Sequence, residues 1–315
     1  MSYVDDKVKF LSNQFKLIYQ RADREIRVTW DAYMKECGKE VADLQQAFEQ
    51  APTRQERNAV GYRLRAAKRK LTIYNRHYKN MVKKIAERLH LTNVDAANLV
   101  NNQLNSVFID AYNRQSLLTS QSILGYSFQL IDTETVEHLV KTGKTLLPYK
   151  TINRRKDIRW NTGKINAEVM QGIIQGEPMD KIANRFERVL NMNQTSAMRN
   201  ARTATLSARE AGEYQSIKKS EERGVIYKKY WVCTHDEKTR PSHEQAARRY
   251  NKSHAIAVDE MFHIGKSEMK YARDPNGRPE DVYNCRCRTI YTPMGFKSTL
   301  SPELHGRIRV VDVNE

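Results

Sequence analysis

The sequence has 315 residues, 29% of them charged, with a formal net charge of +17 and a mean hydropathy of -0.75. It contains no apolar run long enough to span a membrane, no apolar segment of a secretory signal near its start, and only four cysteines. We therefore expect a helix-rich protein of a reducing compartment, not a membrane protein or a disulfide scaffold. The positive charge favours a polyanionic partner such as nucleic acid, although a need for solubility would account for part of it.

Residues 1–91 show two long stretches with the apolar spacing of amphipathic helices. Apolar side chains recur every three or four residues over 8–48 and again over 64–89. Between them a short Ala-Pro-Thr sequence breaks the first helix, and Thr53 with Glu56 forms the capping-box pattern that begins the second. The second stretch has the spacing of an a/d heptad seam, which can pair within one chain or between chains. We expect a long antiparallel helical hairpin here.

The second of these stretches carries much of the basic charge. Between Arg54 and Arg88 the sequence has twelve Lys or Arg residues against two acidic ones. Some of them repeat at helical spacing, which indicates either a solvated helix face or a ridge that follows DNA phosphates. Because no base-reading motif accompanies them, the expected contact with double-stranded DNA is independent of sequence. The residues that would make it are Arg65, Arg69, Arg76, Lys79 and Lys83.

Residues 92–223 are expected to form a second helical domain. A third helix is predicted to begin with a cap at Thr92. The basic stretch 152–160 is interpreted as a linker or a phosphate contact. The last helix of this domain is predicted to run from an Asn193 cap to Gly224.

After the last predicted helix the pattern changes from helical to strand-like. The stretch VIYKKYWVC alternates and is rich in β-branched and aromatic residues, as strands are. Polar turns, a short helix near 242–249 and a later RTIYTPM stretch complete a small α+β domain at 224–296. Residues 297–315 are expected to be a tail, whose RIRVVDV stretch could pair with another chain as a strand. The predicted fold class is mainly α: a long helical hairpin and a helical bundle, then a small α+β C-terminal domain.

Three short motifs of this C-terminal domain belong together. They are the D-x-x-T-R-x-x-H pattern in WVCTHDEKTRPSHEQAARRY, the turn-rich YARDPNGRPED, and the N-C-R-C pattern in YNCRCRTIY. With the preceding helix NARTATLSAREAGEY, they resemble the phage Mu F-like minor head protein family, whose members are head-morphogenesis proteins. The resemblance covers about 195–295. Its motif residues here are Asp236, Thr239, Arg240, His243, Asn284, Cys285 and Cys287.

The resemblance implies a minor structural protein of a tailed-phage head. Such a protein is incorporated in few copies and associates with the portal protein and with capsid or scaffold proteins. It stays inside the capsid near the DNA end, assisting packaging or ejection, and is in the host cytoplasm during assembly. Some family members carry toxin or transferase domains after this unit, and none is expected within this sequence. A non-specific DNA-binding protein is the alternative outside this class.

The motif residues are interpreted first as a structural clamp. Asp236 would accept hydrogen bonds from Arg240 or from backbone amides, and His243 would hydrogen-bond across the loop. Cys285 and Cys287 would share one face of a strand and pack as small apolar residues. In this interpretation the protein has no cofactor.

A zinc site is the alternative for the same residues. Members of the resembled family often carry C-x-x-C where this chain has Arg240 and His243, and these cysteines with C-x-C would complete a four-cysteine site. An arginine cannot bind the metal, so this chain lacks one of the four zinc ligands that those family members would supply. The candidate ligands that remain are Cys233 or His235 with His243, Cys285 and Cys287.

Two enzymatic interpretations were also weighed against the structural one. Cys285, His243 and Asp236 would provide a Cys-His-Asp arrangement. A zinc-dependent hydrolase or nuclease would instead use His235, His243 and His263 with Asp236. Neither spacing matches a catalytic signature, so the sequence predicts that the protein is not an enzyme.

Overall fold

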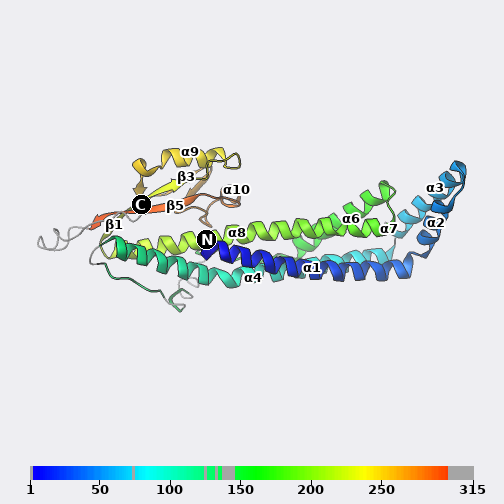
Figure 1. Cartoon of the computed structure of the whole chain (residues 1–315), viewed down its shortest axis with the longest axis horizontal. Helices are drawn as coiled ribbons and strands as arrows, with labels where there is room; N and C mark the ends of the chain where they lie inside the picture. Colours follow the sequence, from blue (N-terminus) through cyan, green and yellow to red (C-terminus); the bar gives the residue numbers. More distant parts are fainter. Residues whose placement is uncertain (1–2, 73–74, 124–125, 132–133, 137–145, 297–315) are drawn as a thin grey trace, which may run out of the picture. The chain divides into compact units, whose positions relative to one another are not determined.

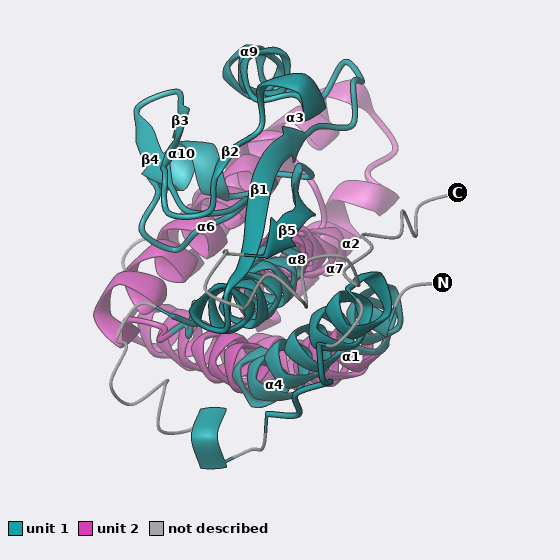
Figure 2. Cartoon of the chain, turned by 90° about the vertical axis from the view of Figure 1, so that its left-hand side faces the viewer, with its two compact units in different colours: residues 1–11, 99–150, 199–315 teal, residues 12–98, 151–198 magenta. Residues whose placement is uncertain are grey.

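The structure is a computed structural model that describes residues 3–72, 75–123, 126–131, 134–136 and 146–296. The tail predicted at 297–315 lies outside the described residues. Contacts divide the chain into two compact units, shown in Figure 2: unit 1 comprises residues 1–11, 99–150 and 199–315, and unit 2 comprises 12–98 and 151–198. These units follow contacts and not sequence order, so the domains expected at 1–91, 92–223 and 224–296 remain a prediction.

Most of the described chain is helical, and its strands lie in the C-terminal part (Figure 1). The predicted fold class is confirmed. The long helices are α1 (Tyr3–Cys37), α2 (Lys39–Gln50), α3 (Arg54–Thr72), α4 (Arg76–Ser122), α6 (Arg154–Ile174) and α8 (Phe186–Glu222). The short ones are α7 (Met179–Asn184), α9 (Pro241–Arg249), α10 (Pro279–Val282) and the 3₁₀ turn η1 (Lys252–His254). The strands are β1 (Val225–Val232), β2 (Ile256–Ala257), β3 (Phe262–Ile264), β4 (Ser267–Met269) and β5 (Arg288–Phe296). Within the described ranges, no helix combines the length and the apolar content that crossing a bilayer requires.

In unit 2, α1 and α4 form the antiparallel hairpin that the sequence predicts. The hydroxyl of Tyr19, in the middle of α1, donates to the side chain of Asn93, in the first half of α4, at 2.7 Å. Further along α1, the ring of Tyr33 packs against Tyr78 with centroids 6.1 Å apart, and its hydroxyl donates to the carbonyl of Leu71 at 2.6 Å. The described apolar residues of the heptad seam, in α3 and α4, are all buried within the chain.

The second predicted helix is in fact two helices, because α3 ends at Thr72 and α4 begins at Arg76. The side chain of Asn75 accepts a hydrogen bond from the amide of His77 at 2.8 Å, as an N-cap residue does. At the other junction the predicted capping box is confirmed. The amide of Glu56 donates to the Thr53 hydroxyl at 3.2 Å, and the amide of Thr53 donates to the Glu56 carboxylate at 3.3 Å.

Two polar residues and one basic stretch have other positions than the sequence predicts. Thr92 lies inside α4, where its hydroxyl donates to the carbonyl of Arg88 at 2.8 Å, so no new helix begins there. Asn193 lies inside α8, buried, and donates to the side chain of Asn161 at 2.9 Å. The stretch 152–160 is not a linker, because Asn153 caps α6 by accepting from the Lys156 amide at 3.0 Å.

In unit 1, a small antiparallel sheet of order β2-β1-β5 packs beside the C-terminal half of α8, and β3 pairs with β4 separately. Alternate residues of β1 are buried, and its Tyr227 donates to Thr119 of α4 at 2.9 Å. α4 and α8 approach closely at Gly212, where an added Cβ would lie 2.4 Å from the carbonyl of Phe108. The aromatic core of the sheet region contains Trp231 with Phe262, at a centroid distance of 5.3 Å.

Candidate functional site

The register of the sheet brings the two motifs of the C-terminal domain together. β1 and β5 are antiparallel neighbours, and the last residue of β1, Val232, pairs with the first residue of β5, Arg288. The segment that follows β1 and the segment that precedes β5 therefore leave the sheet at the same end. The first carries D-x-x-T-R-x-x-H and the second N-C-R-C, so residues about 50 positions apart can meet here.

The first contact between the two segments is an ion pair between Asp236 and Arg286. Both terminal nitrogens of the Arg286 guanidinium donate to the Asp236 carboxylate. The carboxylate also accepts from the Thr239 hydroxyl and the Lys238 amide, each at 3.1 Å. The hydrogen bonds from Arg286 hold the pKa of the Asp236 carboxyl down at about 2. The expected acceptance from backbone amides is present, but the arginine that pairs with Asp236 is Arg286 and not Arg240.

Arg240 makes the second contact. Its guanidinium donates to the carbonyl of Tyr283 at 2.5 Å. The next residue, Asn284, has a left-handed backbone with φ of +58°, a conformation that asparagine tolerates better than most residues. Its amide faces the hydroxyl of Thr203 on α8 at 3.3 Å. Arg240 therefore fixes the turn that leads into the cysteines.

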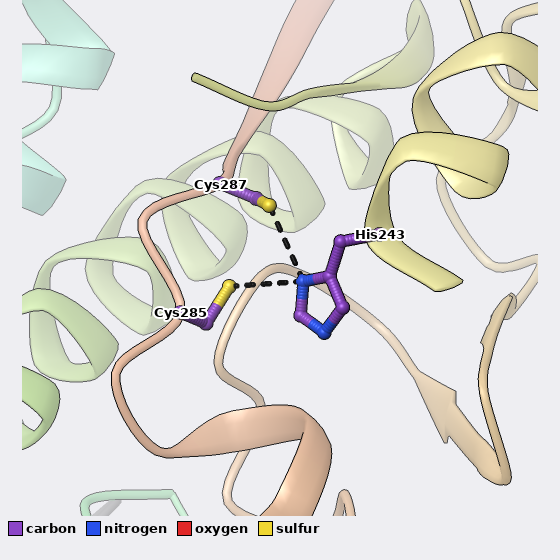
Figure 3. A group of neighbouring side chains, drawn as sticks. All are labelled: His243, Cys285 and Cys287. Atoms are coloured by element: carbon purple, nitrogen blue, oxygen red, sulfur yellow. Dashed lines mark hydrogen bonds between the residues drawn. The ribbon is translucent and has the colours of Figure 1, made fainter. Parts of the chain in front are cut away.

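The third contact places His243 against both cysteines (Figure 3). His243 is 1% exposed in the first turn of α9, and its Nδ1 lies 3.3 Å from the sulfur of Cys287 and 3.5 Å from the sulfur of Cys285. Its ring packs edge-on against Trp231, with centroids 6.0 Å apart. Among the described residues, its Nε2 has no hydrogen-bond partner. His243 thus bonds across the loop as predicted, but the two cysteines are polar partners and not only apolar filling.

The two buried thiols differ in acidity. Hydrogen bonds from the Cys287 thiol and, secondly, from His243 lower the pKa of Cys285 to about 4. Interaction with the Cys285 sulfur raises the pKa of Cys287 well above its usual range. The contact between the two sulfurs therefore favours the thiolate form of Cys285 and the thiol form of Cys287.

A buried ion pair that the sequence analysis did not identify holds the backbone of the cysteines. Arg273 donates to the carbonyls of Cys285 and Cys287 at 2.9 and 2.6 Å, and to the carboxylate of Glu210 on α8 at 3.0 Å. Glu210 also accepts from the amide of Thr289 at 3.0 Å. The signal for Glu210 was a charged residue in a stretch of α8 rich in small residues, ATLSAREAG. Arg273 lies in the turn-rich motif, where nothing local distinguishes it from the other arginine.

Neither enzymatic arrangement is formed by the described side chains. Asp236 is paired with Arg286, so it does not orient His243 as a catalytic triad requires. The cluster of potential metal ligands contains only His243, Cys285 and Cys287, whose ligand atoms lie within 4.8 Å of one another. His235 and His263 are not part of this cluster. Cys233, also outside it, has its sulfur 3.5 Å from Nδ1 of His235.

The residues predicted to contact DNA are all exposed, but they do not form one continuous ridge. Arg65 and Arg69 lie one turn apart on α3, whereas Arg76, Lys79 and Lys83 share a face of α4. The two faces, here called the α3 and α4 basic faces, belong to different helices because of the break after Thr72. For none of these five residues does the described part of the chain record an acidic partner.

Comparison with known proteins agrees with the motifs. Residues 163–290 match the family model described as "Phage Mu protein F like protein". The chain is 24% identical over 196 residues to "Minor head protein GP7" of Bacillus phage SPP1, covering 61% of each protein. It is 30% identical over 198 residues to "NAD(+)--arginine ADP-ribosyltransferase EFV" of Enterococcus faecalis (strain ATCC 700802 / V583), covering 60% of this chain and 36% of that protein.

These matches span about three fifths and about a third of the length of the two relatives. No solved structure matches the chain. The family model covers α8, the segment from Asp236 to His243 and both cysteines of the N-C-R-C motif. These are the features on which the resemblance rests. Over residues 163–290, the chain therefore matches the phage Mu protein F-like family.

Proposed function

We propose that the protein is a minor structural protein of a tailed-phage head, associated with the portal inside the capsid. The observation that supports this most is the match to a minor head protein over 61% of both chains, which includes more than the clamp motifs. The site supports a structural role as well. Its polar side chains bond the segment after β1 to the segment before β5, and its histidine and cysteines are buried.

The proposed location can be tested on purified virions of the phage that encodes the chain. We expect mass spectrometry to find the chain in intact heads in few copies relative to the capsid protein. It should be protected from added protease until the heads are opened, and it should co-purify with the portal protein. A chain that is absent from virions, or digested in intact heads, would contradict the proposal and leave the non-specific DNA-binding protein as the better one.

We further propose that the α3 and α4 basic faces contact DNA phosphates without reading sequence. The faces are suited to this role because exposed, unpaired cations of one sign repel one another unless an anion neutralises them. Lysine and arginine contacts to phosphate release counterions, so affinity falls steeply with salt. The contact would serve packaging or ejection, when genome and head interior are close.

Reversing the charge of Arg69, Arg76 and Lys83 to glutamate should weaken binding to a random double-stranded DNA by about tenfold or more at low salt. The slope of log affinity against log salt should become shallower by about 0.9 for each phosphate that the variant no longer neutralises. The matched control reverses Lys16, Arg24 and Lys35, exposed residues of α1 that change the net charge equally. Fluorescence anisotropy at several salt concentrations measures both quantities. Equal losses in the two triple variants would show that only net charge matters and would refute the basic faces as a site.

A further inference from the structure

We infer that His243, Cys285 and Cys287 form a structural site for a zinc ion. This inference does not depend on the proposed function, because it rests on the geometry of three side chains in unit 1. Their ligand atoms lie within 4.8 Å of one another, and all three residues are buried, unlike the second such group among the described residues (Figure 3). The ion would join α9 to the segment before β5, the same connection that the two arginine contacts make.

The distances fit a tetrahedral zinc ion without movement of the backbone. Zinc binds imidazole nitrogen at about 2.0 Å and thiolate sulfur at about 2.3 Å, so a nitrogen and a sulfur on one tetrahedral ion lie about 3.5 Å apart. Nδ1 of His243 lies 3.3 Å from the sulfur of Cys287 and 3.5 Å from that of Cys285. Both sulfurs approach the same ring nitrogen, which is the arrangement that an ion between them would require.

The chemistry of the three side chains selects the metal. Two thiolates and an imidazole are soft to borderline ligands, which favour zinc over magnesium or calcium. The cluster contains no carboxylate, because Asp236 is paired with Arg286. The metal binds both sulfurs as thiolates, so any proton that a thiol still holds passes to solvent on binding. The fourth ligand would be the buried thiol of Cys233, whose side chain lies outside the converging group and would have to turn toward the ion.

The surroundings hold the ligands in place and keep substrates out. Arg273 fixes the carbonyls of both cysteines, and α9 fixes the histidine in its first turn. The three ligand residues are 1%, 4% and 2% exposed for His243, Cys285 and Cys287. A catalytic zinc keeps an open position for substrate, whereas a structural zinc is enclosed. The burial therefore indicates a structural ion.

Metal analysis of the full-length protein, purified without chelator, tests the inference. We expect one zinc ion per chain in the wild type and its loss in the double variant Cys285→Ser/Cys287→Ser. Cys37→Ser is the matched control, because Cys37 lies with Glu36 and His77 in the other group of potential ligands among the described residues. It should keep its zinc. Zinc that persists in the double variant, or is lost from Cys37→Ser, would place the ion elsewhere and overturn the site.

A second measurement does not depend on the folding of the variants. The chelator-treated wild type should melt at a lower temperature than the untreated protein and recover when zinc is added back. Titration of the chelated wild type with Co²⁺ should give the near-ultraviolet thiolate-to-cobalt charge-transfer band, which zinc then removes. A wild type that contains no zinc and gives no such band would refute the site.

Discussion

Replacing Arg273 by methionine should destabilise the C-terminal domain by up to about 3–5 kcal/mol, the range for breaking a buried ion pair. The side chains of Arg273 and Glu210 are 1% and 0% exposed, so the carboxylate of Glu210 would lose its fully buried cation and keep only Arg209, which lies 2.7 Å away. The carbonyls of Cys285 and Cys287 would also lose their donor. Hydrogen–deuterium exchange should show faster exchange in the peptides of β5 and α9.

A second substitution distinguishes loss of the ion pair from loss of packing. The double variant Arg273→Met/Glu210→Gln should be more stable than Arg273→Met alone, because glutamine removes a buried charge that has lost one of its two cationic partners and keeps the size of the side chain. Arg278→Met is the control. It removes the other arginine of the same turn-rich motif, whose side chain is 56% exposed, and should change exchange little. A double variant no more stable than the single one would show that the charge is not what makes Arg273 important.

The second large effect concerns pH and Lys229, a fully buried lysine in the middle of β1. Its ammonium group donates to the carbonyl of Lys270 at 2.7 Å and lies 4.7 Å from the ring centre of Phe262. Burial lowers its pKa to about 7, which outweighs the opposing effect of Asp259. In the unfolded chain the pKa of the same amine is 10.5.

The unfolded state therefore binds a proton that the folded state does not bind between pH 7 and 10.5. The free energy of unfolding should rise with pH across this window, by on the order of 4 kcal/mol from this residue. In Lys229→Met this rise should disappear, and the variant should be at least as stable as the wild type at pH 7. Lys228→Met, an exposed neighbour on the same strand, should keep it. Denaturant unfolding at a series of pH values measures the slope, and parallel curves for wild type and Lys229→Met would contradict the assignment.

The periodic features of the fold could be predicted from sequence, because they depend on local spacing. The hairpin of α1 and α4, the capping box at Thr53 and the strand β1 are of this kind. Single polar residues were harder to place. Thr92 and Asn193 have the side chains of helix caps, but both lie inside long helices, where Asn193 bonds to a residue of another helix. Only the packing around them decides between the two roles.

The candidate site shows the same division. The sequence identified which residue types gather after β1 and before β5, but not all of their partners. Arg240 is near Asp236 in sequence and was the expected partner, yet the sheet register brings Arg286 to the carboxylate across 50 positions. Arg273 and Glu210 are 63 positions apart, so no local pattern connects them. The basic residues expected on one helix lie on two, because α3 ends at Thr72. Heptad spacing does not reveal this break.

The strand order β2-β1-β5 has a consequence for biosynthesis. One of the two partners of β1 is β5, the final strand of the described chain, so β1 emerges from the ribosome long before the strand that completes its sheet. Until then Trp231 and His243 have neither the cysteines nor β5 to cover them. The domain must therefore close after translation of 288–296, while the helices upstream can already fold. A truncated chain that stops before Cys285 would leave this apolar surface exposed, which would make the chain a substrate for quality-control proteases.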